Sequence, residues 1–335
     1  MNEDSSRETA NELFKQGRWE SAATAYRHVV EISPKDYWSH YNLGQCLSRL
    51  KRFEEAIIVY QQAIEINDGE FWSHHHLGHA LSEVGRRNEA VAVYRQAIRI
   101  DRGQFWAYFN LGRELSQLQR WEEAATAYRQ AIQVDPSIFW PHYHLGHTLS
   151  ELRRWEEAVT AYRNALQVKP DVFWPNFELG KALLNLKRWD EAAIACQQAI
   201  QIEPDKFWPH FYLGQAQSEL ERWEQAVFAY RNAIQIDPGM VWAHFNLGKA
   251  LFELKRLDES ASAYRHAIGV KSDWYLPYCS LAQVLEHSRQ WEEAINNYRA
   301  GIALNPGDPD CRERLARLLL TLGSIYSDDR PGIFS

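Results

Sequence analysis

The sequence predicts an all-α solenoid, a stack of similar helix pairs, and three observations support this fold class. Apolar and aromatic residues recur with a fixed period of 34 residues along almost the whole chain, so that Leu145-Gly146 returns as Leu111-Gly112 and as Leu179-Gly180. The period contains no insertions. Within each period the apolar spacing is helical in two separate blocks. Such a repeat is typical of units that stack side by side rather than of one globular core.

Each repeat is expected to fold as two short antiparallel helices. In residues 139–172 the apolar blocks cover 139–152 and 155–168, and both show the three- and four-residue spacing of a buried helical stripe. The residues Lys-Pro-Asp at 169–171 end the second block, because proline cannot continue a helix. Proline is tolerated in a first helical turn. It therefore marks the start of the first helix where it stands third in a repeat, at Pro141, Pro175, Pro209 and Pro277.

The domain organisation that we predict is a single solenoid over residues 3–323. Its nine repeats are expected at 3–36, 37–70, 71–104, 105–138, 139–172, 173–206, 207–240, 241–274 and 275–308. Residues 310–323 match another first helix with extra charge on one side, so we expect a C-terminal capping helix that covers the last apolar surface. Residues 324–335 are expected to form a disordered tail.

Composition argues against several classes of partner and compartment. A net charge of −7 and a pI near 6.0 argue against nucleic-acid binding, which usually needs a basic surface. No stretch approaches the roughly 18 apolar residues of a membrane span, so no membrane partner is expected. The polar N-terminus does not read as a signal peptide. Cys46, Cys196, Cys279 and Cys311 lie far apart without a CxxC pair, which predicts reduced thiols and a cytoplasmic protein.

The repeat residues carry a family resemblance. In residues 139–172 these are the Leu-Gly pair at the seventh and eighth positions, Ala158, Tyr162, Ala165 and Pro170, and on them the chain resembles the tetratricopeptide repeat (TPR) family over roughly residues 3–323. The resemblance implies a right-handed superhelix, with positions 2, 5, 6, 9, 12 and 13 of each repeat lining its concave groove. The chain departs from the family at the turn between helices, where Gly85 keeps the family glycine but most repeats do not. In those repeats the turn residue is Lys51, Gln119, Arg153, Lys187, Glu221 or Lys255.

No catalytic motif is present, so we predict that the chain is not an enzyme and needs no cofactor. It contains no phosphate-binding glycine loop, no HExxH, no GxSxG and no zinc-type Cys/His spacing. Histidines cluster at 74–76 with His79 and at 142–147, but no further ligand completes a metal shell, so no metal site is predicted. We expect instead a groove whose positive charge rises as the pH falls through about 6.5.

Tryptophan at the second position is the most conspicuous candidate for binding. The candidate anchors are Trp72, Trp106, Trp140, Trp174 and Trp208. They could line the groove as an aromatic track, since tryptophan gives large contact areas. They could equally wedge against the preceding repeat as core residues, and the sequence leaves both interpretations open. Tryptophan at the seventeenth position, as in Trp155 and Trp189, is predicted to be core.

Polar side chains at the sixth and ninth positions are the second set of candidates. The sixth position supplies Asn42, His76, Asn110, His144, Tyr212 and Asn246. The ninth supplies His79, Arg113, His147, Lys181 and Lys249. These positions lie near one another on the first helix of each repeat and are predicted to face the groove. The asparagines resemble the ladder with which the repeats of O-linked N-acetylglucosamine transferase grip a peptide backbone. The cations resemble the carboxylate clamp of chaperone-binding repeats. Pairing within a helix, as between His79 and Glu83, is the alternative.

Together these patterns predict a scaffold that binds an extended peptide or protein segment in its concave groove. Arg113 and Lys181 favour an acidic partner. Two alternatives stay open. The FW-rich repeats resemble those joined to bacterial glycosyltransferase or sulfotransferase domains, so the chain could be the repeat arm of such a protein. The tryptophan row could also bind carbohydrate. The sequence predicts no oligomeric state.

Overall fold

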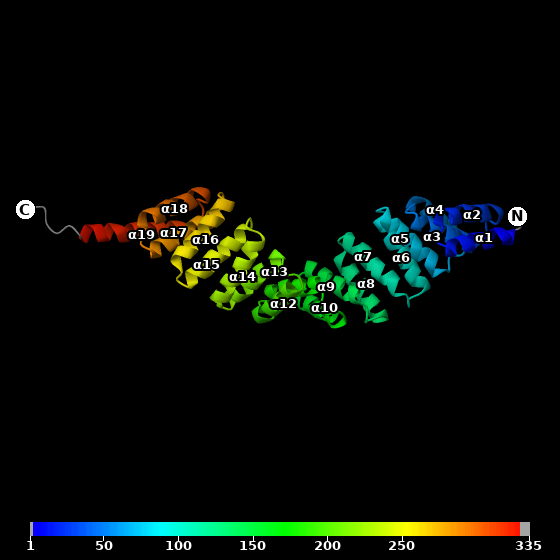
Figure 1. Cartoon of the computed structure of the whole chain (residues 1–335), viewed down its shortest axis with the longest axis horizontal. Coiled ribbons are helices and arrows are strands. Elements are labelled where there is room, and N and C mark those ends of the chain that lie inside the picture. The colour runs from blue at the N-terminus through cyan, green and yellow to red at the C-terminus, as the bar shows by residue number, and fades with distance from the viewer. Residues whose placement is uncertain (1–2, 329–335) are drawn as a thin grey trace, which may run out of the picture. The chain divides into compact units, whose positions relative to one another are not determined.

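The fold is an all-α solenoid of tandem helix pairs, as the sequence predicts. The computed structural model describes residues 3–328 and contains nineteen α-helices and no strand within that range. Figure 1 shows the helices following one another as antiparallel pairs along the chain. Within each of the two compact units described below, the first helix of a pair also packs against the second helix of the pair before it. Such stacking of neighbours replaces a single central core.

Ten helices make up the first of two compact units, residues 1–170. They are α1 (Glu3–Lys15), α2 (Trp19–Ile32), α3 (Tyr37–Arg49), α4 (Phe53–Ile66), α5 (Phe71–Glu83), α6 (Arg87–Ile100), α7 (Phe105–Gln117), α8 (Trp121–Val134), α9 (Phe139–Glu151) and α10 (Trp155–Val168). Odd-numbered helices are the first helices of their repeats and even-numbered helices are the second. We call the surfaces that they form the first-helix face and the second-helix face.

The second unit, residues 171–335, continues the same pattern. Its helices are α11 (Phe173–Asn185), α12 (Trp189–Ile202), α13 (Phe207–Glu219), α14 (Trp223–Ile236), α15 (Val241–Glu253), α16 (Leu257–Val270), α17 (Tyr275–His287), α18 (Trp291–Leu304) and α19 (Pro309–Asp328). Helix α19 is longer than the predicted capping helix, so residues 324–328 are helical where we expected tail. The rest of the predicted tail, 329–335, lies outside the described residues.

The close approach of the two helices in a pair explains the glycine at the eighth position. A Cβ atom on Gly146 would lie 2.6 Å from ring atoms of Tyr162, which is fully buried. The Tyr162 hydroxyl lies 3.3 Å from the hydroxyl of Ser150 on the first helix. In the repeat that has Cys196 in place of this tyrosine, Leu184 stands at the serine position, so the polar pair is replaced as a unit. Glycine and tyrosine thus fill one space between the two helices.

The turns keep the family geometry without the family glycine. Lys51, Gln119, Arg153, Lys187, Glu221, Lys255 and Arg289 all have positive φ, between 56° and 62°. The following arginine continues the turn: the backbone N–H of Arg154 donates to the carbonyl of Leu149. Its guanidinium pairs with Glu157 at 2.7 Å in the first turn of α10. Hydrogen bonds on both sides of the turn therefore hold a non-glycine residue in the left-handed region.

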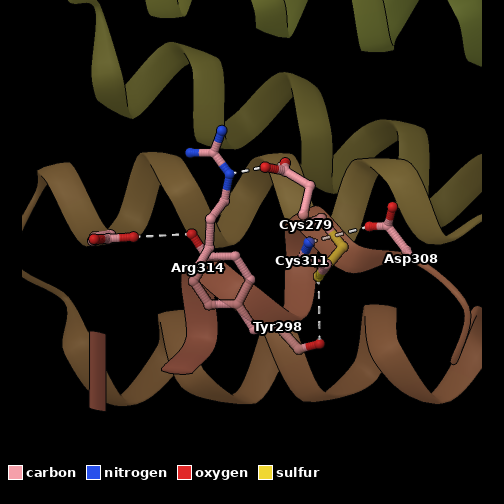
Figure 2. The surroundings of a disulfide bond; sticks show 7 residues. Cys279, Tyr298, Asp308, Cys311 and Arg314 are labelled. Carbon is pink, nitrogen blue, oxygen red and sulfur yellow. Dashed lines mark hydrogen bonds and ion pairs between the residues drawn. A yellow bond between two sulfur atoms is a disulfide. The ribbon is translucent and has the colours of Figure 1, made fainter. Parts of the chain in front are cut away.

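One cysteine prediction is wrong. Cys279 on α17 and Cys311 on α19 form a disulfide, so these two thiols are not free, whereas Cys46 and Cys196 are unpaired and buried. Figure 2 shows the bond with Asp308 beside it. The Asp308 carboxylate accepts a hydrogen bond from the Cys311 backbone N–H. Disulfides persist in oxidising environments, so the cysteines no longer argue for a cytoplasmic protein. None of the helices over residues 3–328 combines the length and apolar character that crossing a bilayer requires.

Candidate functional site

The tryptophans of the second position lie on the surface, next to a phenylalanine that is buried or, in the case of Phe139, half-buried. Trp72 is 43% exposed and Trp140 is 55% exposed, while Phe71 is only 6% exposed. Trp106, Trp174 and Trp208 behave like Trp140. Each indole meets the preceding phenylalanine edge to face, with ring centroids about 5 Å apart. The first aromatic position therefore supplies the core contact, and the second is left exposed to solvent.

Stacking joins the tryptophan to the residue at the sixth position. Trp72 stacks on His76 with centroids 6.0 Å apart, and Trp140 stacks on His144 at the same separation. In the second unit Trp208 stacks on Tyr212 at 5.7 Å. His76 also stacks on Tyr60 of the preceding repeat, at 5.9 Å. Within each unit, the tryptophans and their partners at the sixth position form an aromatic ledge on the first-helix face.

The histidines of the ledge are less readily protonated than the sequence predicts. Burial, followed by the charge of a neighbouring histidine, lowers the pKa of His76 to about 4 and the pKa of His144 to about 4. Burial lowers the pKa of His75 still further, to about 3. These imidazoles therefore stay neutral through pH 6.5. The prediction that the groove gains charge at that pH is wrong for His76 and His144.

Two of the predicted asparagines bond to side chains of the protein itself. Asn110 is buried, and its amide lies 3.1 Å from Nε2 of His75. Asn42 is half-buried and donates to the hydroxyl of Tyr26 over 3.2 Å. Both side chains hold neighbouring repeats together. Of the predicted asparagines, Asn246 is half-buried and lines a cavity, described below.

Side chains at the ninth position differ in how strongly they are held. His79 pairs with Glu83 at 3.8 Å, as the spacing suggests, whenever its imidazole is protonated. Arg113 lies 3.8 Å from Glu114, while His147 and Lys249 are exposed. Lys181 donates to Glu178 over 2.8 Å and lies over the ring of Phe177.

In the second unit, four predicted residues meet in one cavity on the first-helix face. Lys181 of α11, Tyr212 of α13, and Asn246 and Lys249 of α15 line a space of about 360 Å³. The remaining lining residues are Leu184, Asn185, Trp189, Gln215, Ser218, Glu219 and Tyr230. Two ammonium groups, one carboxylate and several amides and hydroxyls thus surround an aromatic wall. Such a lining suits a ligand with a carboxylate and hydrogen-bonding groups.

The sequence reasoning missed several of these lining residues. Asn185, Ser218 and Glu219 occupy the twelfth and thirteenth positions, and the family resemblance was the signal that could have found them. Trp189 was predicted to be core, yet it is half-buried and reaches the cavity. Trp155, with the same prediction, is half-buried as well.

A possible metal-binding group lies elsewhere. Among the described residues, ligand atoms of Cys279, Asp308 and Cys311 lie within 4.8 Å of one another. The two sulfurs are bonded to each other, which removes their thiolate character. The group therefore fits a disulfide with a neighbouring carboxylate better than a metal centre.

Family models match most of the chain. Models described as tetratricopeptide repeat match residues 7–71, 73–104, 143–206, 243–273 and 280–318. One described as TPR repeat matches 112–153 and 218–255. The chain belongs to the tetratricopeptide repeat family. A search of curated proteins finds no match to the sequence.

Solved TPR structures share the fold at low sequence identity. One is described as YrrB, a TPR protein with an unusual peptide-binding site. It is 23% identical with a TM-score of 0.52, over 55% of this chain and 95% of that chain. Another is PilF of Pseudomonas aeruginosa, 19% identical with a TM-score of 0.51, over 64% of this chain and 97% of that one. These likenesses support the TPR fold.

Proposed function

We propose that this TPR protein is a non-catalytic scaffold that binds an extended, acidic peptide or protein segment on its first-helix face. The cavity between α11, α13 and α15 carries the proposal, because it combines two lysines with amide and aromatic groups. Lys181 and Lys249 would hold a carboxylate of the segment, while Asn246 and Gln215 would bond to its backbone. TPR proteins generally bind proteins, and YrrB is described as having a peptide-binding site, which supports this class of ligand.

The exposed tryptophans extend the proposed surface beyond the cavity. Trp174 and Trp208 lie on α11 and α13, the helices that also supply Lys181 and Tyr212. Half-exposed indoles on fixed helices make good anchors because little conformational freedom is lost on binding. They would contact apolar side chains of the segment and thereby add affinity that does not depend on charge.

Binding to an array of extended peptides of graded acidity would test the proposal. Lys181→Ala with Lys249→Ala should lower the affinity for the best acidic peptides about tenfold or more, because each substitution removes a charge-assisted hydrogen bond. Lys169→Ala with Lys271→Ala, at exposed lysines that do not line the cavity, is the matched control and should change little. Equal binding by both double variants would refute the role of the cavity. A glycan array on the same proteins would test carbohydrate as the ligand.

A further inference from the structure

The second-helix face has a recurring ion pair that ties successive repeats together. The arginine at position 25 of one repeat pairs with the glutamate at position 19 of the next. Arg27–Glu55 and Arg129–Glu157 are 3.0 Å apart, and Arg265–Glu293 are 2.8 Å apart. Arg95–Glu123 and Arg231–Glu259 belong to the same series. Each pair spans the furrow between two successive second helices.

The furrow between α12 and α14 lacks both members of this pair and is open, whereas between α4 and α6 only the arginine is replaced, by Gln61. Gln197 replaces the arginine and Gln225 replaces the glutamate, and two neutral amides cannot form an ion pair. A cavity of about 700 Å³ occupies this furrow. The equivalent cavities measure about 300 Å³ between α14 and α16, and about 460 Å³ between α6 and α8 in the first unit. Leu213, whose counterparts Leu111 and Leu247 are buried, is half-buried here.

A third departure from the repeat lies in the wall of the same cavity. Gln217 stands at position 11, where the other repeats from residue 37 onward have a buried leucine: Leu47, Leu81, Leu115, Leu149, Leu183, Leu251 and Leu285. Gln217 is only 4% exposed, and its Oε1 atom has no hydrogen-bond partner in the described part of the chain. A buried acceptor of this kind calls for a donor. Gln217 lines the cavity, so a rotation of its side-chain amide that exposes Oε1 would let a bound group supply one.

The other residues that line the cavity indicate which further chemical groups a ligand should have. Phe228, which is 68% exposed, and Ile200 give the cavity an apolar side. Gln201 and Asn232 add further amides beside Gln197 and Gln225. Nε2 of His210 donates to the carbonyl of Pro204 over 3.0 Å, so that nitrogen is already engaged. Glu224 is the acidic residue of the lining, and no lysine or arginine belongs to it. An anionic ligand therefore finds no counter-charge here.

We propose that this cavity on the second-helix face is a second binding site, for a tyrosine side chain of an uncharged peptide segment in a partner protein. The tyrosine ring would pack between Phe228 and Ile200, and its hydroxyl would donate to Oε1 of Gln217. The amides of Gln197 and Gln225 would bond to the peptide backbone on either side. Aromatic residues with a polar tip suit a site that is apolar at its walls and polar at its end.

A matched pair of small probes tests the proposal, because they differ only in the hydroxyl. N-acetyl-tyrosinamide and N-acetyl-phenylalaninamide would be titrated against the full chain by ligand-observed NMR. The tyrosine probe should bind roughly five- to tenfold more tightly, as expected for one hydrogen bond to a buried acceptor. Gln217→Leu, which restores the repeat leucine, should abolish that preference. Gln197→Arg with Gln225→Glu, which restores the ion pair across the furrow, should weaken both probes.

Several outcomes would overturn the proposal. They are equal affinity of the two probes for the wild-type chain, no saturable binding of either, and a tyrosine preference that survives Gln217→Leu. Saturable binding of methyl glucoside in place of the peptide probes would show a saccharide site instead. Gln130→Ala, in the equivalent cavity between α6 and α8, is the control and should leave both affinities unchanged. Thermal melting would establish that each variant is folded. Loss of acidic-peptide binding in the lysine variants would not bear on this site, because the two cavities share no residue.

Discussion

At the scale of the residue, two aromatic side chains that are adjacent in the sequence differ in burial. Phe71 is buried between repeats, whereas Trp72, one residue later on the same helix, is largely exposed. Successive residues of a helix point about 100° apart, so an aromatic pair cannot be buried on both sides. The sequence could predict that one of the two packs and one is free, but not which, because both are large and apolar.

Replacing Trp106, Trp140 and Trp174 together by alanine should preserve the fold and weaken binding. These indoles are between 52% and 55% exposed, so circular dichroism should show unchanged helix content and only a small shift in melting temperature. Affinity for the acidic segment should fall about tenfold, and most of the loss should come from Trp174, which lies on the same helix as Lys181 of the cavity. Tyr162→Ala is the contrasting control: this ring is fully buried and its loss should destabilise the fold by about 3–5 kcal/mol. Global unfolding of the triple variant would instead make the tryptophans core residues.

Because the histidines of the ledge are neutral in the folded chain, we expect the stability of the fold to fall at a pH above that at which carboxylates become protonated. The pKa of His76 and of His144 is about 4 in the folded chain, against about 6.5 when unfolded. Between these values the unfolded chain binds more protons, so stability is full above pH 6.5 and falls as the pH drops toward 4. The loss should be roughly 2–3 kcal/mol for each histidine.

Urea unfolding at graded pH would measure this loss. His76→Asn with His144→Asn should reduce the pH dependence between 6.5 and 4.5, and His75 should keep part of it, since its pKa is lowered to about 3. Asparagine should be tolerated because it occupies the same repeat position in Asn42, Asn110 and Asn246. His28→Asn, at an exposed histidine, is the control. An unchanged slope in the double variant would show that other groups cause the acid sensitivity.

At the scale of the element, the last helix is held by a covalent bond as well as by packing. The disulfide connects α17 to α19 across α18, over a sequence separation of 32 residues. A Cβ atom on Gly301 of α18 would lie 2.6 Å from the sulfur of Cys279, so α18 passes directly against the bond. The Tyr298 hydroxyl on α18 donates to Glu286 of α17 over 2.9 Å. The end of the second unit is therefore cross-linked around a close helix contact.

Removing the disulfide should loosen this end of the chain and leave the rest intact. Cys279→Ser with Cys311→Ser, or reduction of the wild type, should destabilise the last repeat by about 3 kcal/mol, because a closed loop of this length constrains the unfolded state. Amide hydrogen exchange should quicken in α17 and α19 and stay unchanged in α3 to α8. Cys46→Ser, at an unpaired cysteine, is the control for thiol loss. Unchanged exchange in α19 after reduction would show that packing alone holds this helix.

At the scale of the molecule, the sequence predicts what the 34-residue period repeats and misses what is particular to one repeat. Helix boundaries follow from the period, because every repeat packs its two helices in the same way. The bond between Cys279 and Cys311 could not be predicted, since both cysteines lie in the divergent C-terminal region and no consensus pairs them. The neutral state of His76 depends on its burial, and the ring of Tyr60, one repeat earlier, stacks on it. The cavity at Gln217 requires departures on three helices to meet in space.

Because solenoid repeats contact only their neighbours, the acidic-segment site should work within one unit. All residues that line the cavity lie between Lys181 and Lys249, well inside residues 171–335. A fragment of residues 171–335 should therefore bind the best acidic peptide within about threefold of the whole chain. Fluorescence anisotropy would measure the two affinities, and circular dichroism would establish that the fragment is helical. The same fragment with Lys181→Ala and Lys249→Ala should lose binding. A folded fragment that fails to bind would mean that the segment depends on the ledge at His76 and His144 in the first unit.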